Sequence, residues 1–148
     1  MVYLVSDHGG FDAKAHLVRW LKSNHVPVID LGPEEAVAED DYPMWAARLA
    51  RQIQKSKKSC GIALCRSGVG MAIVANKFSG IRAAQAFTPA MAAKSRTDED
   101  TNVLSLAADY LSQRELRAIV RTWLTTKYTS TPRYQRRLKE IRSLEHGR

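Results

Sequence analysis

The sequence predicts an α/β fold, specifically a doubly wound, Rossmann-like α/β/α sandwich with a five-stranded parallel sheet and an extended C-terminal helix. Short apolar strand patterns alternate with helical patterns along the 148 residues. The expected strand at 61–65 is apolar throughout, as parallel strands covered on both faces usually are. No repeat, long linker or low-complexity segment interrupts the pattern, so we expect residues 1–148 to form a single domain.

The expected elements follow from the spacing of apolar residues. Strands are predicted at 2–6, 27–31, 61–65, 81–87 and 102–107. Helices are predicted at 11–24, at 43–57, from the loop 66–70 to 77, and at 89–95, 112–125 and 132–144. In the first helix, Leu17, Val18 and Leu21 recur at helical spacing, and Pro43 suits the first turn of the second.

The formal net charge of +8 calls for an explanation. Basic residues crowd the last sixteen positions: Arg133, Arg136, Arg137, Lys139, Arg142 and Arg148. A nucleic acid, a small anionic substrate or a solvated helix face would each account for them. No helix-turn-helix, zinc-finger or aromatic-rich RNA-binding signature accompanies the charge, so we expect no nucleic-acid partner.

Composition excludes several other classes. The chain is 45% hydrophobic and 26% charged, as soluble globular proteins are, and its apolar runs are too short to span a membrane. The N-terminus has no basic region and no small-residue cleavage site, so we expect a cytoplasmic protein without a signal peptide. Cys60 and Cys65 belong to one expected strand, which disfavours a disulfide, and two cysteines without clustered histidines make a poor metal site.

Ligands of doubly wound folds bind beyond the carboxyl ends of the strands. This rule predicts a site built from residues 7–10, 65–70 and 87–88. We add the segment 98–102, which leads into the fifth strand, because polar residues gather there too.

The segment Cys65-Arg66-Ser67-Gly68-Val69-Gly70 closes a strand and opens a helix. Its glycines allow a tight turn whose N–H groups point into a cleft, where they favour a thiolate at Cys65 or hold an oxyanion. Such a site suits either acyl transfer or proton abstraction beside a carbonyl. The plain alternative is a buried cysteine that only fills space. The segment lacks the G-x-G-x-x-G dinucleotide pattern, so we expect no NAD.

The segment Asp7-His8-Gly9-Gly10 follows the first strand. Aspartate and histidine at a strand end can bind hydroxyl and phosphate groups. The alternative is a helix-capping aspartate beside a loop histidine.

Six motifs in order carry a resemblance to a known family. They are Asp7-His8-Gly9-Gly10, Asp41-Tyr42-Pro43, the segment from Gly61 to Gly70, Ala75-Asn76-Lys77, Gly80-Ile81-Arg82, and Asp100-Thr101-Asn102-Val103-Leu104. With the C-terminal pair Arg133 and Arg137, the chain resembles the type B ribose-5-phosphate isomerases and the related galactose-6-phosphate isomerases over nearly its whole length.

The resemblance implies reversible aldose–ketose isomerisation of a phosphorylated sugar through an enediolate, with no metal and no organic cofactor. Cys65 matches the base, Ser67 a hydroxyl that supports it, and Gly68, Val69 and Gly70 the loop that holds the enediolate. The other positions expected to contact substrate are Asp7, His8, Tyr42, Asn102, Arg133 and Arg137, together with Arg66 and Glu99, whose residue types differ from the family's. The family builds its site across a dimer interface, so we expect a homodimer or tetramer.

The chain departs from the family pattern at several positions. Asp98 and Glu99 replace a His-Asn pair whose histidine is associated with opening the sugar ring, and Asp98 is the weaker base unless burial raises its pKa. Asp109 stands where many members have a phosphate-binding arginine, and its carboxylate would repel phosphate. Arg66 replaces a glycine and would supply a new positive charge, and Tyr134 replaces a common histidine.

Three functions remain open at this point. The first is interconversion of ribose 5-phosphate and ribulose 5-phosphate. The second is isomerisation of another sugar phosphate, such as a tetrulose 4-phosphate or a hexose 6-phosphate; a four-carbon substrate is too short to form an ordinary ring and needs no ring-opening base. The third is a non-catalytic sugar-phosphate-binding protein, against which the retained Cys65 argues.

Overall fold

A computed structural model describes residues 1–38, 40–56 and 58–145. Five strands form one parallel sheet in the order β2-β1-β3-β5-β4. They are β1 (Val2–Ser6), β2 (Val28–Asp30), β3 (Cys60–Cys65), β4 (Ala83–Gln85) and β5 (Val103–Ala107). The helices are η1 (His8–Gly10, a 3₁₀ turn), α1 (Phe11–Ser23), α2 (Tyr42–Gln54), α3 (Val69–Ala75), α4 (Pro89–Glu99), α5 (Gln113–Thr125) and α6 (Pro132–Glu145).

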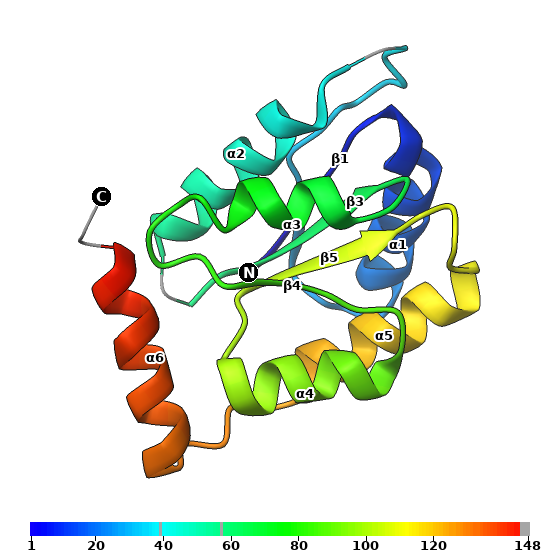
Figure 1. The fold of residues 1–148 in the computed structure, drawn as a ribbon. Helices are drawn as coiled ribbons and strands as arrows, with labels where there is room; N and C mark the ends of the chain where they lie inside the picture. The colour runs from blue at the N-terminus through cyan, green and yellow to red at the C-terminus, as the bar shows by residue number, and fades with distance from the viewer. Residues whose placement is uncertain (39, 57, 146–148) are drawn as a thin grey trace.

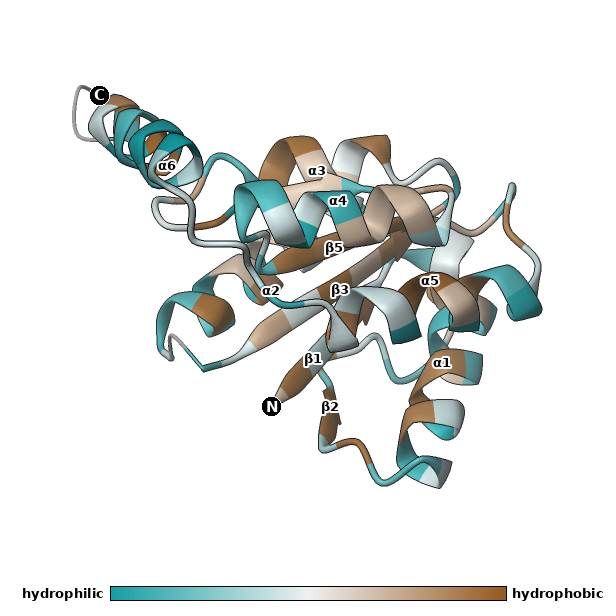
Figure 2. Ribbon diagram, turned by 90° about the horizontal axis from the view of Figure 1, so that it is seen from below, coloured by the Kyte–Doolittle hydropathy of each residue, from teal (hydrophilic) through white to brown (hydrophobic). Residues whose placement is uncertain are grey.

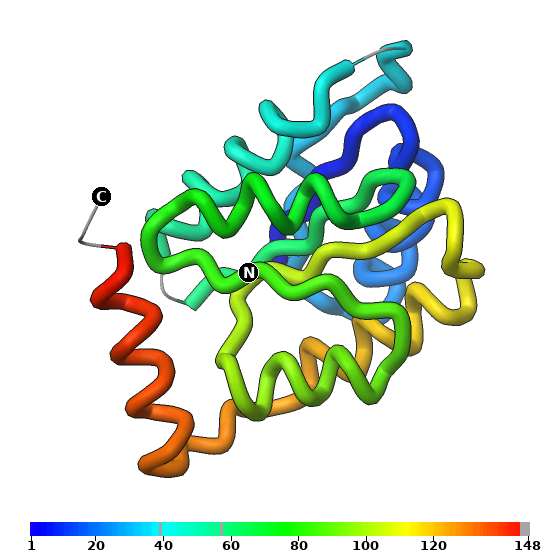
Figure 3. Tube along the Cα trace, viewed as in Figure 1, coloured from blue at the N-terminus to red at the C-terminus, as the bar shows by residue number. Residues whose placement is uncertain are grey.

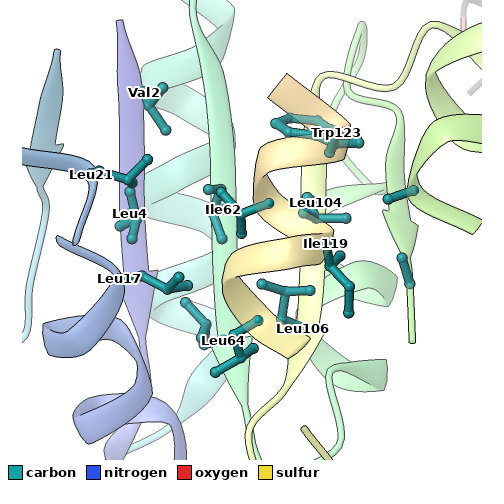
Figure 4. Close-up of a cluster of buried hydrophobic side chains, with 14 of the residues drawn as sticks. Val2, Leu4, Leu17, Leu21, Ile62, Leu64, Leu104, Leu106, Ile119 and Trp123 are labelled. Atoms are coloured by element: carbon teal, nitrogen blue, oxygen red, sulfur yellow. The ribbon is translucent and has the colours of Figure 1, made fainter. Parts of the chain in front are cut away.

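Helices cover both faces of the sheet (Figure 1). On one face α1, α4 and α5 pack against the strands, where Leu17, Ile119 and Trp123 meet Ile62 and Leu104 (Figure 4). On the other face α2 and α3 bury a second cluster of apolar side chains. The central strands are strongly apolar, as Figure 2 shows, because both of their faces are covered. The predicted doubly wound sandwich is confirmed.

The central strands β1 and β3 form the part of the sheet where a ligand-binding site is expected. The chain leaves β1 through α1 on one face and returns to β3 through α2 on the other, so the winding changes direction between these neighbouring strands. Their pairing sets Ser6 opposite Leu64. The next residues, Asp7 and Cys65, therefore emerge side by side at the carboxyl edge, where such folds bind ligands.

The C-terminal helix α6 stands beside the sheet at the edge where the strands begin (Figure 3). Leu138 is its buried anchor. At the C-terminal end of the helix, the Glu145 carboxylate accepts hydrogen bonds from Ser79 Oγ at 3.0 Å and from the Gly80 N–H at 2.9 Å. The predicted C-terminal helix is thus present, and it is held at its middle and at its end.

Several elements differ in length from the sequence prediction, among them β2, β4 and α4. The strands β2 and β4 are three residues long, because each is an outermost strand of the sheet and pairs with one neighbour only. Helix α4 continues to Glu99 instead of ending at residue 95, and Asp100 ends it with a left-handed backbone (φ +44°). Asp98 and Glu99 therefore belong to a helix end instead of a loop.

None of the described helices combines the length and apolar character that crossing a bilayer requires.

Candidate active site

The thiol of Cys65 lies at the carboxyl end of β3 and is almost fully buried. The backbone N–H of Gly68 donates to its Sγ at 3.1 Å. Gly68 has φ +76°, and a methyl group there would lie 2.9 Å from Gln85 Nε2 and 3.0 Å from the Leu106 carbonyl carbon. Only glycine combines this backbone conformation with so close an approach, so the turn aims an N–H donor at the sulfur.

Neighbouring strands hold the turn in place. The Gln85 side-chain amide donates to the Ser67 carbonyl, and Ser105 Oγ donates to the Gly68 carbonyl at 2.5 Å. The hydroxyl of Ser67 accepts from the Val69 N–H at 3.3 Å. Ser67 thus shapes the same turn as Cys65, although the hydrogen bond that it accepts comes from Val69.

Tyr42, at the start of α2, lies directly over this turn. A methyl group on Gly70 would come within 2.6 Å of the Tyr42 ring. Tyr42 therefore packs against the glycine turn, and only a residue without a side chain leaves room for its ring at position 70. That Tyr42 binds substrate stays a prediction.

Asp7 is buried at the end of β1 beside the cysteine turn. Its backbone N–H donates to the Leu64 carbonyl at 3.3 Å, and its carboxylate accepts from the Gly10 N–H at 3.0 Å. Burial raises the pKa of the Asp7 carboxyl, a tendency that the Gly10 hydrogen bond opposes. Asp7 caps η1, as the alternative interpretation of this motif holds, and still lies at the site.

The adjacent His8 is held by a residue that sequence analysis missed, Asp40. One carboxylate oxygen of Asp40 accepts the His8 N–H and pairs with His8 Nδ1, both at 2.8 Å, and the other accepts Trp45 Nε1 at 2.6 Å. The hydrogen bond to Asp40 raises the pKa of His8. The acidic residues before Tyr42 were the available signal, but they suggest only a solvated loop until the fold brings them to His8.

Arg66 and Asp109 form a pair at the mouth of the site. Arg66 Nη1 lies 3.5 Å from Asp109 Oδ2, and the Asp109 N–H donates to the Arg66 carbonyl at 3.0 Å. The stem of Arg66 covers Gly9, where a methyl group would come within 2.5 Å of Arg66 Cγ. The two departures from the family pattern therefore lie side by side as an exposed pair of opposite charges.

The segment 98–102 does not join this site within one chain. It precedes β5 and so lies at the edge where the strands begin, opposite Cys65, and its inclusion among the carboxyl-edge segments is wrong for a single subunit. Asp98 binds Lys94 Nζ at 2.8 Å and Thr97 Oγ1 at 2.9 Å. The hydrogen bond from Lys94, aided by Thr97 and Tyr134, lowers the pKa of Asp98, so burial does not make it a better base.

The other predicted residues of this second region serve the fold or face solvent. Asn102 Oδ1 accepts the Arg82 N–H, and its Nδ2 donates to the Gly80 carbonyl, each at 2.8 Å. Glu99 lines a cleft of about 510 Å³ beneath α6. Arg133 and Arg137 are exposed, one helical turn apart on α6.

The carboxyl edge thus brings together a thiol, a turn that presents N–H groups, an aspartate, a histidine and a tyrosine. A thiolate beside N–H donors can take a proton from carbon next to a carbonyl while the donors hold the resulting oxyanion. Among the described residues, no three His, Cys, Asp or Glu side chains gather in a way that suits a metal ion.

Comparisons with known proteins give this geometry a family. A sequence model of the ribose/galactose isomerases matches residues 2–141. The Escherichia coli ribose-5-phosphate isomerase B is 37% identical over 142 residues, which cover 96% of this chain and 94% of that protein. A probable ribose-5-phosphate isomerase B of Mycoplasma pneumoniae is 36% identical over 97% of this chain and 94% of its own length.

Solved structures agree with the sequence comparisons. The ribose-5-phosphate isomerase B of Mycoplasma genitalium, crystallised with ribulose 5-phosphate, superposes with a TM-score of 0.95 at 33% identity over 99% of this chain and 97% of that one. The Clostridium thermocellum enzyme gives a TM-score of 0.94 at 32% identity, again over 99% and 97% of the two chains. On this evidence the chain belongs to the ribose/galactose isomerase family.

Proposed function

We propose that this protein interconverts ribose 5-phosphate and ribulose 5-phosphate, with Cys65 as the base. The observation that carries the proposal is the buried Cys65 thiol, which receives the Gly68 N–H at 3.1 Å in a turn held by two neighbouring strands. This arrangement belongs to the carboxyl edge between β1 and β3, where doubly wound folds bind ligands.

The reaction needs one proton to move between two carbons. The Cys65 thiolate takes the proton from C2 of the aldose; the C–H electron pair forms the C1–C2 double bond, and the carbonyl electrons move onto O1. N–H groups at the start of α3, beyond the Gly68 N–H that donates to Sγ, stabilise the resulting enediolate, because they are fixed before the charge develops. Return of the proton from sulfur to C1, with O1 protonated and the O2 proton lost, yields the ketose.

A second copy of the chain would complete the site. Asp98, Arg133 and Arg137 correspond to site residues by resemblance, yet they lie at the edge opposite Cys65 in one chain. Two subunits arranged with opposite edges together would unite the halves, so we propose a homodimer or a higher assembly of dimers. The exposed arginines of α6 would then supply positive charge for the phosphate.

A four-carbon sugar 4-phosphate is the second candidate substrate. The hydrogen bonds to Lys94, Thr97 and Tyr134 lower the pKa of Asp98, which leaves a weak base where relatives have a histidine. A four-carbon substrate has no ring to open, so the weakness of Asp98 would not matter. This observation favours the short substrate over a cyclic hexose phosphate.

A panel of sugar phosphates tests the proposal. The purified protein should convert ribose 5-phosphate to ribulose 5-phosphate, and its kcat/KM for tetrulose 4-phosphate and galactose 6-phosphate ranks the alternatives. Activity should survive EDTA, since backbone N–H groups and not a Lewis acid are proposed to hold the enediolate. A protein that binds these compounds without isomerising any of them would replace the enzyme hypothesis by the binding-protein hypothesis.

A further inference from the structure

The contact between His8 and Asp40 is more specific than a surface ion pair. A single oxygen of Asp40 receives both the backbone N–H and the ring Nδ1 of His8 at 2.8 Å. This double contact fixes the position of the histidine and the orientation of its ring together. With Nδ1 turned to the carboxylate, Nε2 is the ring nitrogen that remains for a ligand.

Asp40 is buried for this task, whereas His8 is open. The Asp40 side chain is 5% exposed, and the His8 side chain is 36% exposed. The second Asp40 oxygen accepts a hydrogen bond from Trp45 Nε1 at 2.6 Å, so both carboxylate oxygens bind groups of the protein itself. The imidazole is the part of the pair that a ligand can reach.

His8 also belongs to the cysteine site by position. It follows Asp7, whose backbone binds Leu64 next to Cys65, and it precedes Gly9, which the stem of Arg66 covers. His8 therefore lies at the same end of the sheet as the Cys65 turn.

We propose that Asp40 is a positioning residue that keeps His8 protonated, with Nε2–H offered to an anionic oxygen of the bound sugar phosphate. This inference rests on the proposed function. The anionic oxygen belongs either to the phosphate or to the enediolate, and both favour an imidazolium donor.

The charges around His8 support a protonated ring. The hydrogen bond to Asp40 raises the pKa of His8, burial opposes it, and the charge of Asp7 raises it further. Arg66 is the cation packed beside this turn, and its guanidinium is paired with Asp109. Because a group with a raised pKa keeps its proton to higher pH, Asp40 extends the pH range in which the donor is present.

The Asp40→Asn variant tests the proposal through pH dependence. The asparagine keeps the size of the side chain and removes the charge, so the alkaline limb of the kcat/KM profile should move to lower pH. We expect kcat/KM to fall about tenfold on the alkaline side and less than threefold at acid pH, because the imidazolium is lost only where the pH exceeds its pKa. Asp40→Glu should restore the limb, and Trp45→Phe, which removes only the other hydrogen bond, should leave it in place.

NMR titration of the His8 ring gives a readout that does not need turnover. The His8→Asn spectrum assigns the signal, and Asp40→Asn should lower its pKa in the free protein. Inorganic phosphate should raise the pKa of His8 if the partner is the phosphate, and an unphosphorylated hydroxamate that mimics the enediolate should raise it if the partner is the enediolate. Either response supports the proposal.

Two results would overturn it: a His8 pKa that neither probe raises, or an Asp40→Asn loss of kcat/KM that is equal at every pH. A wild-type protein that isomerises no sugar phosphate would instead refute the proposed function, and the titrations would still decide whether Asp40 charges His8 for an anion.

Discussion

The two edges of the sheet use similar residue types in opposite ways. At the carboxyl edge, the Gly68 N–H binds the Cys65 thiol and the buried Asp40 carboxylate binds the His8 ring, and we propose that both groups meet the substrate. At the opposite edge, charged side chains bind one another: Asp100 pairs with Arg82 at 2.9 Å and with Arg96 at 3.3 Å. We propose that the first edge binds the substrate, whereas the described charges of the second stabilise the turn into β5.

This difference teaches that a motif locates a residue but does not reveal its partners. By resemblance, Asp98 occupies a position associated with catalysis. Within one chain, however, it forms an ion pair with Lys94 near the end of α4. Substitutions at the carboxyl edge should therefore affect catalysis, and substitutions at the other edge should affect stability or the contact between subunits.

The largest effect is expected from the two cysteines of β3, one at each end of the strand. Cys65→Ala should lower kcat by at least about 10³-fold, because it removes the proposed base while the glycine turn remains. Cys60→Ala should leave kcat unchanged. Iodoacetate should label Cys65, with protection by substrate. Cys60 is the more exposed of the two residues, so its labelling should be slowed by the raised pKa of its thiol and not by a lack of access.

Mass spectrometry after labelling and steady-state kinetics of both variants provide the measurements. If Cys65→Ala kept most of its activity, the thiol would not be the base, and the carboxyl edge would have to act through Asp7 or His8.

A second comparison uses two glycines with nearly the same backbone conformation. Gly68 (φ +76°) lies in the cysteine turn, whereas Gly80 (φ +74°) lies at the other edge, where a methyl group would meet nothing within 4 Å. Both alanine variants should lose about 1–2 kcal/mol of stability from the left-handed backbone. Only Gly68→Ala should also lose activity, about 10²-fold. Its methyl group would clash with Gln85 and Leu106 and so displace the turn whose N–H donates to Cys65.

Thermal unfolding and kcat, measured on both glycine variants, separate the two effects. Equal losses of activity in the two variants would show that backbone strain alone accounts for the effect and that the position of the turn is unimportant.

Complementation tests whether the two edges meet between subunits. Cys65→Ala and Arg137→Ala subunits should each be weakly active alone. After mixing, unfolding and refolding together, half of the dimers would be mixed, and each would contain one intact site. About a quarter of wild-type activity should return. A monomeric protein with full activity, or mixtures that stay inactive despite heterodimer formation, would contradict a shared site.

The sequence was sufficient for most of the fold because apolar periodicity and turn residues report local structure directly. The strand β3 and the cysteine turn lie where the pattern indicates, and Asp7 and Tyr42 reach the site as expected. The role of Asp40 was not predicted, because it depends on a contact with His8, which lies 32 residues away in the chain. The pairing of Arg66 with Asp109 went unpredicted for the same reason.

The placement of Asp98 failed on a different point. The polar residues 98–102 precede β5, and they were grouped with segments that follow the other strands. In a parallel sheet, residues before and after a strand lie at opposite ends of it, so this grouping placed Asp98 at the wrong end of the sheet. Sequence order alone resolves this, once strand direction is applied to each segment.

The smallest effect is expected from Asp98→Asn. The hydrogen bond from Lys94 lowers the pKa of Asp98, so the charged form is favoured in the folded protein. Any stability that the carboxylate contributes is therefore present above its ordinary pKa and lost as pH falls through the lowered one. Asp98→Asn should reduce thermal stability slightly at neutral pH and not at all in acid.

The same variant decides whether the second edge takes part in catalysis on cyclic substrates. Because Asp98 is a weak base held by Lys94, Asp98→Asn should change kcat/KM by less than about threefold for both ribose 5-phosphate and tetrulose 4-phosphate. Asp98→His should raise the rate on ribose 5-phosphate alone, with a pH profile that follows an imidazole near 6.5. A tenfold loss on ribose 5-phosphate in Asp98→Asn, with the four-carbon substrate unaffected, would contradict this expectation. It would identify the Asp98 carboxylate, contributed by the second subunit, as the group that opens the sugar ring. Only the five-carbon sugar forms a ring that must open before Cys65 can act.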